Sequence, residues 1–557
     1  MDISKRFPSQ IRELHSNLLP FDGTTYANDF YHDVFPRMVT PLGTQSVFPD
    51  WLSGEFFLAC GVRPFFFHDI YNAGDCSNFV AMIASLYSPA LAVEAQKIFP
   101  DLIGRFGFMP GVMNRGPKDD QAFTLDYSQT AWGPFGYWDQ FAWTRDRRFL
   151  ASHADACAAW AKWWLANRDR NGDGWIEPGV NDCKPSTPQF RAEMSRRHPE
   201  PGRLCPEYWD YTGVHNDQAS AMNLMVFEIP WDDSPAHIRG RSRHLRFDPA
   251  TKSATIHYIE SQLYVSLLCG FAAAAMRLRG NQREVEFFRH HANRLNGLVR
   301  DHCWDETTGF YHDRDVATGR LDTQVKHLGA FVAMFMGLPT CEQARRMVEH
   351  LTNPAEFWTP YPAPTISHDS ADYHPTHYWS GRAWPPTNFF VLKALLNYGY
   401  FDEADELLRR WTRLMKTCID RTPDTDNTDA TFEGTFDARR STAGGAKWIS
   451  PENWNPETGE VIGSGGVSWG ALWVPAVVYR HFWPIGENHV LLRPGGEFRL
   501  RWSDRWDIHI KNNQAEVNGR SYALDPQTTS LLDESTGHIR PLQPGQADPV
   551  QLEFSPT

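Results

Sequence analysis

The 557-residue sequence lacks several features that would assign a protein to a class. Its nine cysteines form no Cys-x-x-Cys pair, so neither a zinc ribbon nor a disulfide framework is indicated. Lysine and arginine (54) are outnumbered by aspartate and glutamate (67), which gives a net charge of −13. Because no basic block offsets this excess, a nucleic-acid partner is not expected. No P-loop, dinucleotide fingerprint or His-Glu-x-x-His motif occurs.

Long hydrophobic runs are also missing. No apolar run reaches the roughly 18 residues of a membrane-spanning helix, and the first eight residues lack the apolar stretch of a secretory signal. We therefore expect a cytoplasmic globular protein without a membrane partner. The hydrophobic fraction of 41% is sufficient for a sizeable core.

Aromatic residues are abundant, with 22 tryptophans within an aromatic fraction of 14%. Indole and phenol rings have flat apolar faces with one polar edge, which suits the apolar faces and hydroxyl rims of sugars. A large aromatic core would produce the same composition. The positions of the rings must decide between these two interpretations.

Helical periodicity dominates from about residue 70 to residue 485. The predicted helices span residues 72–87, 89–104, 128–144, 149–169, 217–228, 254–280, 282–305, 325–337, 341–353, 388–400, 402–420 and 466–483. Several form pairs in which the first helix is apolar on all sides (389–396) and the second is striped (403–410). A helix that is apolar on all sides must be surrounded by other parts of the protein, whereas a striped helix exposes its polar side to water. The pattern predicts a mainly α fold, an (α/α)6 barrel of inner and outer helices.

The connections and the ends of the chain complete this domain prediction. The long polar connections are expected at one end of the barrel, where they would form a pocket; they are residues 105–127, 170–216, 354–387 and 421–465. The predicted units are an N-terminal extension that packs on the barrel (1–64), the barrel (65–485) and a small β appendage (486–557). Within the appendage, Asn518-Gly519 is a strong signal for a β-hairpin.

An aromatic segment opens one predicted inner helix. Residues 377–388 read His-Tyr-Trp-Ser-Gly-Arg-Ala-Trp-Pro-Pro-Thr-Asn. Three ring systems and Arg382 stand beside prolines that fix the backbone. The segment suits a stacking and hydrogen-bonding wall for a polyol ligand, and we favour this interpretation over a rigid aromatic plug.

Two carboxylates are candidates for acid–base chemistry. Glu452 is followed by Asn453 and Trp454 between two prolines, so it is a candidate general base, although an ordinary acidic loop reads the same way. Asp217 lies at the start of a predicted helix, where a lone aspartate is more often a cap. An acid at that position needs burial to raise its pKa, because the helix dipole lowers it.

Two nearby carboxylates are alternatives to Asp217 as the acid. Glu207 and Asp210 both lie within the ten residues that precede it in the sequence. The residue types alone do not choose among the three.

These motifs resemble those of clan-G inverting glycosidases of the family 63 type, which include mannosylglycerate hydrolases and, more distantly, trehalases. Residues 378–385 are similar to their Tyr-Trp-Arg-Gly-Pro-x-Trp-Pro segment, and residues 452–459 to Glu-Asn-Tyr-Asp-Pro-x-Thr-Gly. Val-Ser-Trp at 467–469 is similar to their Phe-Ser-Trp. Their Glu-Ser-Gly-x-Asp-Asn-Ser segment is matched loosely at 213–220, where two further residues separate the glycine from the aspartate. The resemblance covers roughly residues 65–485.

The resemblance implies an inverting hydrolase of an α-linked glucoside or a related small α-glycoside, which is the expected partner molecule. Asp217 would be the general acid and Glu452 the general base, in agreement with the need for two carboxyl groups about 6.5–9.5 Å apart. Residues expected to bind the sugar are Asp69, Gln129, Trp132, Tyr378, Trp379, Arg382 and Trp384. This chemistry requires no cofactor.

One loop resembles half of a calcium-binding loop. Asp169, Asn171 and Asp173 alternate as EF-hand ligands do, and Glu177 follows them. Val180 stands where the bidentate glutamate of an EF-hand belongs, so a cage would need Glu177 or a distant carboxylate. The alternatives are a structural Ca²⁺ held by these four residues and a plain turn that caps a helix.

Two other functions stay open. A sugar isomerase or polysaccharide lyase on the same barrel would use a histidine or tyrosine as base, and His215, His327 and His377 are candidates. A non-catalytic carbohydrate-binding protein would keep the aromatic wall. The Gly-x-Ser-x-Gly pattern around Ser468 lacks the preceding hydrophobic strand of a nucleophile elbow, so a nucleophilic serine is not expected.

Overall fold

The structure is a computed structural model in which most of the helical region and the C-terminal strands are described. The described residues are 3–19, 22–33, 39–41, 56–58, 75–110, 113–115, 121–123, 127–131, 134–181, 228–229, 247–248, 250–361, 363–420, 450–462 and 468–547.

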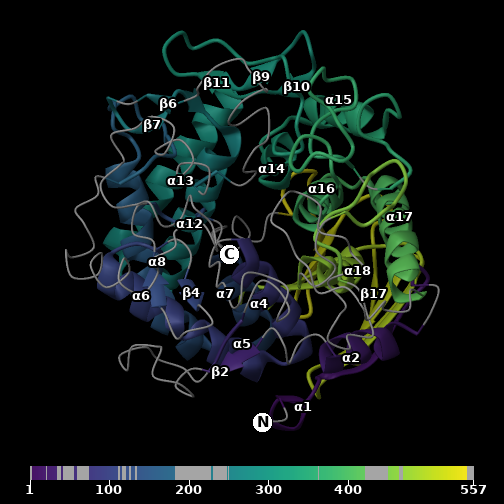
Figure 1. Ribbon diagram of the computed structural model, residues 1–557. Helices are drawn as coiled ribbons and strands as arrows, with labels where there is room; N and C mark the ends of the chain where they lie inside the picture. The colour runs from purple at the N-terminus through teal and green to yellow at the C-terminus, as the bar shows by residue number, and fades with distance from the viewer. Residues whose placement is uncertain are drawn as a thin grey trace.

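Among the described residues, six helices form a closed ring (Figure 1). Around the ring they are α4 (Asp75–Tyr87), α7 (Pro134–Thr144), α12 (Ile259–Leu278), α14 (Ala330–Phe335), α16 (Pro385–Asn397) and α18 (Trp473–His481). Each helix packs against the next, and α18 closes the ring on α4 together with the 3-10 turn η3 (Ser468–Leu472). All thirteen residues of α16 are buried, as expected for a helix that is apolar on every side.

Other helices lie outside this ring (Figure 1). They are α5 (Pro89–Gln96), α6 (Ile98–Phe106), α8 (Arg147–Asn167), α13 (Gln282–His302), α15 (Cys341–Thr352) and α17 (Phe401–Asp420). Helices α8 and α13 pack on α12, and α17 packs on α16 and α18. Helix α13 buries only one stripe, through Val285, Phe288, Leu295 and Val299. This striped pattern is the one predicted for outer helices.

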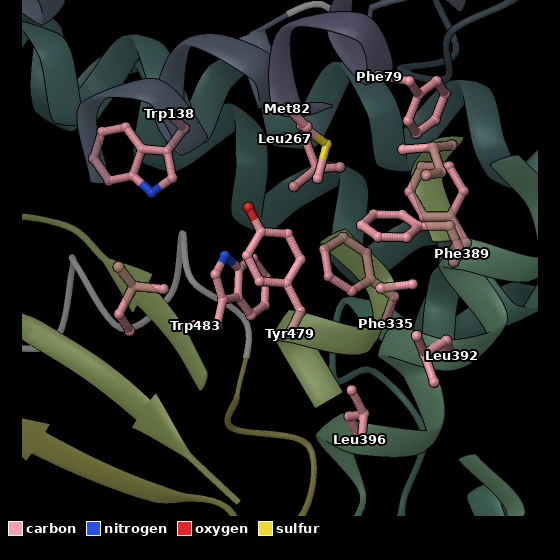
Figure 2. Packing of buried hydrophobic residues seen from close by; sticks show 14 of the residues in the cluster. Phe79, Met82, Trp138, Leu267, Phe335, Phe389, Leu392, Leu396, Tyr479 and Trp483 are labelled. Atoms are coloured by element: carbon pink, nitrogen blue, oxygen red, sulfur yellow. The ribbon is translucent and has the colours of Figure 1, made fainter. Parts of the chain in front are cut away.

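The middle of the ring is filled by side chains from all six helices (Figure 2). They include Phe79 and Met82 of α4, Trp138 of α7, Leu267 of α12, Phe335 of α14, Phe389 of α16 and Tyr479 of α18. Phe79 meets Phe389 and Phe390 edge to face, a favoured geometry for aromatic pairs. Much of the aromatic content therefore forms a core.

One of these core helices is also long and apolar enough to span a membrane. An 18-residue window of α12 has a mean hydropathy of 1.3, but all of that window is buried inside the fold. Serine, glutamine and glycine interrupt the apolar residues of α12, so its sequence contains no continuous apolar run of that length.

The C-terminal region forms two antiparallel sheets. One has the strand order β12 (Phe482–Ile485), β13 (His489–Leu492), β18 (Ser530–Asp533) and β19 (Ile539–Pro541). The other has the order β1 (Ile11–Ser16), β14 (Glu497–Trp502), β15 (Trp506–Lys511), β16 (Gln514–Val517) and β17 (Arg520–Ala523). Asn518 and Gly519 join β16 to β17 with φ of 50° and 79°, so the predicted hairpin is confirmed.

The remaining elements are short. They are α1 (Ile3–Arg6), α2 (Gly23–Asp33), β2 (Val39–Pro41), β3 (Phe56–Leu58), β4 (Met113–Arg115), β5 (Gln121–Phe123), β6 (Phe247–Asp248), β7 (Ser253–Ala254), β8 (Ile256–His257), β9 (Trp304–Asp305), β10 (Phe310–Tyr311) and β11 (Arg314–Asp315). The β-strands among them pair as two-stranded ladders.

The predicted mainly α fold with a C-terminal β appendage is confirmed, and the differences are local. Helix α7 begins at Pro134 instead of residue 128, and α16 begins at Pro385 instead of residue 388, because proline suits the first helical turn. The predicted helix 89–104 is two helices, α5 and α6. Strand β1, in the predicted N-terminal extension, pairs with β14 of the appendage. The domain boundaries stay a prediction.

Candidate active site

Glu452, the predicted base, lies in a loop whose backbone is fixed on its C-terminal side. Its side chain is buried, with 4% of its surface exposed. Two residues later, Trp454 exchanges two backbone hydrogen bonds with Ala383, at 3.0 and 3.1 Å. The Asn455 side chain then accepts hydrogen bonds from the next turn, at the backbone N–H of Glu457 (2.9 Å). The loop therefore holds the carboxylate of Glu452 through rigid backbone on its C-terminal side.

The aromatic segment before α16 contacts this carboxylate directly. The Tyr378 hydroxyl donates a hydrogen bond to Oε1 of Glu452 at 3.3 Å. Arg382 donates from Nη1 to Oδ1 of Asn453 at 3.1 Å, and from Nε to the carbonyl of Thr376 at 2.8 Å. The structure thus brings together the two segments that the sequence analysis singled out, with Tyr378 and Arg382 bonded to adjacent residues of the Glu452 loop.

Two tryptophans stack behind Tyr378. The rings of Trp379 and Trp384 lie 3.6 Å apart with an interplanar angle of 8°, and Trp384 donates from Nε1 to the carbonyl of Tyr378. Trp379 is 3% exposed and Trp384 has no exposed surface. In this structure the stacked pair supports Tyr378 through the hydrogen bond and the edge-to-face ring contact of Trp384. Direct contact of either ring with a sugar stays a prediction.

Isolated β-bridges connect the segments that precede three ring helices. His327 bridges to Ile366, Pro364 bridges to Ala383, and Ala383 bridges to Trp454. Since these segments lead into α14, α16 and α18, the bridges hold one end of the ring together and carry Glu452 at that end. Adjacent backbones in such a row are about 4.8 Å apart.

Gln129, a predicted sugar-binding residue, lies in the extended segment before α7. Its side chain is 2% exposed, and its backbone N–H donates to the carbonyl of Met109 at 3.0 Å. The neighbouring Ser128 accepts a hydrogen bond from Nε1 of Trp160 at 2.8 Å. The segment that carries Gln129 is therefore held by Met109 on one side and by Trp160 of helix α8 on the other.

The four residues of the predicted calcium loop lie close together. Asn171 donates from Nδ2 to Asp173 Oδ2 at 3.0 Å and to Glu177 Oε1 at 3.3 Å, and Asp169 Oδ1 accepts from the N–H of Gly174. Burial raises the pKa of Glu177, and the carboxylates of Asp173 and Asp169 raise it further, against the opposing effect of His257. The loop therefore concentrates negative charge.

His257, which the sequence analysis did not consider, faces this acidic loop. Its Nε2 lies 2.9 Å from Glu177 Oε1 and 3.2 Å from Asp173 Oδ2. Its Nδ1 lies 3.4 Å from Nη1 of Arg314. Because a guanidinium can only donate, Arg314 is the donor in any hydrogen bond between these two side chains.

A second charged cluster lies where α12 and α14 begin. His327 Nδ1 is 3.3 Å from Glu260 Oε1, and its Nε2 is 3.4 Å from Asp313 Oδ2. Burial disfavours the charged imidazole, but the carboxylates of Glu260 and Asp313 outweigh it and raise the pKa of His327 to about 10. The two carboxylates therefore favour the protonated form of His327. No sequence motif marks Glu260 or Asp313, which lie 53 residues apart (313 − 260 = 53).

Several predicted site residues fall outside the described part of the chain. They are Asp69, Trp132, His215 and Asp217, together with the alternative acids Glu207 and Asp210. Their roles stay predictions.

Comparison with known proteins identifies the family. Residues 107–470, more than half of the chain, match the family model of the mannosylglycerate hydrolase MGH1-like glycoside hydrolase domain. The chain belongs to this family. Membership of this MGH1-like family confirms the resemblance drawn from residues 378–385 and 452–459.

Individual relatives match shorter stretches of this MGH1-like chain. The mannosylglycerate hydrolase of Rubrobacter radiotolerans is 30% identical over 164 residues, or 28% of this chain and 36% of that protein. The cytosolic neutral trehalase of Kluyveromyces lactis is 35% identical over 121 residues, or 21% of this chain and 16% of that protein. These matches span well under half of either relative.

A solved structure shows the same fold. The GH63 mannosylglycerate hydrolase from Thermus thermophilus, in complex with glucose, has a TM-score of 0.51 and 17% identity, covering 76% of this chain and 95% of that chain. At this identity the likeness supports the fold alone.

Proposed function

We propose that this MGH1-like glycoside hydrolase is an inverting α-glycosidase on an (α/α)6 barrel, which cleaves an α-linked glucoside or a related small α-glycoside. Glu452 is the general base and Asp217 the general acid. The observation that carries the proposal is the buried carboxylate of Glu452, held at one end of the helix ring with the Tyr378 hydroxyl on its Oε1.

The base role follows from the hydrogen bonding of Glu452. Tyr378 donates a hydrogen bond to Oε1 of Glu452, and we assign the attacking water to the same carboxylate. A hydroxyl that donates to an ionised carboxylate stabilises the charged form and orients it. Glu452 takes a proton from water as the water oxygen bonds to the anomeric carbon. The glycosidic C–O bond breaks on the opposite face, and Asp217 gives its proton to the leaving oxygen.

The substrate range is suggested by the relatives. The named relatives include a mannosylglycerate hydrolase and a neutral trehalase, and these names refer to small glycosides. We propose a substrate of this size, with the α-linkage that the family resemblance implies. We assign Arg382 and Gln129 to hydrogen bonds with the hydroxyl groups of this substrate.

The charges in the site disfavour a lyase or isomerase that uses His327 as base. A histidine that acts as general base must be neutral to accept a proton, whereas Glu260 and Asp313 favour the protonated form of His327 by raising its pKa to about 10. His377 is half-buried and stacks on His374 with ring centroids 3.8 Å apart. Loss of turnover in His377→Ala with full activity in Glu452→Gln would favour that alternative.

We also propose a structural Ca²⁺ at the acidic loop. The carboxylates of Asp169, Asp173 and Glu177 and the amide oxygen of Asn171 are the hard oxygen donors that Ca²⁺ prefers. Bound Ca²⁺ would neutralise the concentrated charge of the loop and take the carboxylate oxygens that His257 now contacts. It takes no part in the proposed bond cleavage.

A panel of substrates tests the proposal. Purified protein is incubated with trehalose, α-linked glucose disaccharides, glucosylglycerate and mannosylglycerate, and sugar release is measured. Glu452→Gln should abolish turnover. Glu457→Gln is the matched control, because Glu457 lies on the same loop, bonds a different tyrosine (Tyr373, 3.0 Å) and is partly exposed. Binding without turnover in the wild type would instead favour a non-catalytic carbohydrate-binding protein.

A further inference from the structure

The carboxylate of Glu228 is buried with every acceptor position in use. Its side chain has no exposed surface. Oε1 accepts hydrogen bonds from the Ser128 N–H at 2.7 Å and from Nη2 of Arg168. Oε2 accepts from Nε of Arg168 at 2.6 Å and from the Gly179 N–H at 2.8 Å. Each oxygen therefore receives one backbone donor and one guanidinium donor.

Arg168 holds this carboxylate from the C-terminal end of α8. Its side chain is also fully buried, and the guanidinium lies over the ring of Trp163 at 4.6 Å. Beyond the two bonds to Glu228, its Nη2 donates to Oδ1 of Asn181 at 2.7 Å, and its Nη1 to the carbonyl of Asn167 at 3.0 Å. A bidentate arginine–carboxylate pair with this many hydrogen bonds is held in a fixed geometry.

The pair joins segments that are far apart in the sequence. Ser128, whose N–H is bound by Glu228, directly precedes Gln129. Gly179, bound by the other oxygen, follows the acidic loop and bridges to Ser253, six residues before the start of α12. One carboxylate therefore sets the positions of the segments that lead into α7 and α12.

We propose that Glu228, with Arg168, is a positioning residue that fixes Gln129 for substrate binding. This inference rests on the proposed function, in which Gln129 binds a sugar hydroxyl. The peptide group with the Ser128 N–H directly precedes the peptide group with the Gln129 N–H. A displacement of Ser128 therefore moves Gln129. Glu228 does not itself contact substrate in this account.

The chemistry requires a carboxylate at this position. A glutamine has one carbonyl oxygen and one NH2 group, and the NH2 group can only donate. In one orientation of the glutamine in Glu228→Gln, the NH2 group faces the Ser128 N–H and Nη2 of Arg168. In the other orientation it faces the Gly179 N–H and Nε of Arg168. In both cases donor meets donor. The substitution therefore releases one segment and leaves the Arg168 charge buried without its partner.

A double-mutant cycle in the full chain tests this role. Glu228→Gln, Gln129→Ala and the double variant are compared by kcat and KM on the substrate that the wild type cleaves best. We expect each single variant to raise KM about tenfold or more, and the double variant to stay within about threefold of the worse single one, because both act through Gln129. Losses that multiply in the double variant would overturn the inference.

Two further variants keep the test decisive. Asp405→Asn breaks a partly buried arginine–carboxylate pair, Asp405 with Arg480, away from this site, and should lower Tm without changing KM. If Glu228→Gln does not fold, Glu228→Asp replaces it, since the shorter carboxylate cannot reach both N–H groups. An absence of wild-type turnover on the whole panel would refute the proposed function and this inference with it, whereas turnover without coupling would refute only the inference.

Discussion

The hydroxyl of Tyr378 lies 3.3 Å from Oε1 of Glu452, and 74 residues of chain separate the two. This contact connects the segment before α16 to the loop before α18. It orients the carboxylate that we propose as the general base.

Tyr378→Phe should lower kcat about 10- to 100-fold. The phenylalanine keeps the edge-to-face contact with Trp384, so the loss reports the hydroxyl alone. A hydrogen bond to a charged group contributes about 1.5–3 kcal/mol, and about 1.4 kcal/mol corresponds to a tenfold change. Tyr373→Phe is the control, because it removes a similar bond to Glu457, and its kcat should stay near the wild-type value. Equal losses in the two variants would contradict the assignment.

Asp217→Asn and Glu452→Gln should differ on a glycosyl fluoride. Fluoride leaves without protonation, so a variant without its acid keeps activity on this substrate while it loses activity on ordinary glycosides. A variant without its base loses both, because the attacking water is no longer activated. Rates on α-glucosyl and α-mannosyl fluoride are compared with rates on the natural substrate. If Asp217→Asn is as inactive on the fluoride as Glu452→Gln, Asp217 is not the acid.

Asp139, inside the helix ring, should make stability depend on pH. Burial raises the pKa of Asp139 to about 6, although the hydrogen bond from Tyr479 and the charge of Lys393 oppose the shift. The folded protein then binds a proton that the unfolded chain, with its usual pKa of 3.8, has already lost. This contribution is fully present below pH 3.8 and is lost as the pH rises through about 6.

Asp139→Asn should remove that dependence. Each pKa unit corresponds to about 1.4 kcal/mol, so Tm of the wild type should fall relative to the variant between pH 4 and pH 7. Asp155→Asn is the control, because its side chain is 72% exposed. Parallel Tm curves for the wild type and Asp139→Asn would show that the shift is absent.

Calcium should stabilise the protein through the acidic loop. Adding millimolar Ca²⁺ to chelator-treated protein is expected to raise Tm by several degrees, since a ligand that binds only the folded state stabilises it. Asp173→Asn and Glu177→Gln should lose the response. Mg²⁺ should have less effect, because it demands tighter octahedral geometry. An identical Tm with chelator and with Ca²⁺ would contradict the proposed site.

Local patterns in the sequence predicted much of the fold. The pair 254–280 and 282–305 is close to α12 and α13, because an all-apolar helix and a striped helix differ plainly in their residue pattern. The Asn518-Gly519 hairpin was predictable because both residues accept positive φ. The pairing of β1 with β14 was not, because nothing local in the 11–16 segment names a partner almost 500 residues away.

The site was predictable only where its residues are consecutive. Tyr378, Arg382 and Glu452 stand in motifs that the resemblance identified. The triad around His327 and the pair of Glu228 with Arg168 join residues from separate segments, so no local pattern in the sequence shows that they pair. His327 illustrates the difference, since the sequence offered it as a base and the structure surrounds it with two carboxylates.

The stereochemistry of the first product tests the central claim most directly. Proton NMR follows the anomeric signals during the first minutes of hydrolysis of an α-linked substrate, before mutarotation mixes the anomers, with Glu452→Gln as control. We expect the wild type to release the β-anomer first and the variant to release no product. Release of the α-anomer first would contradict the inverting mechanism and the role of Glu452 as its base.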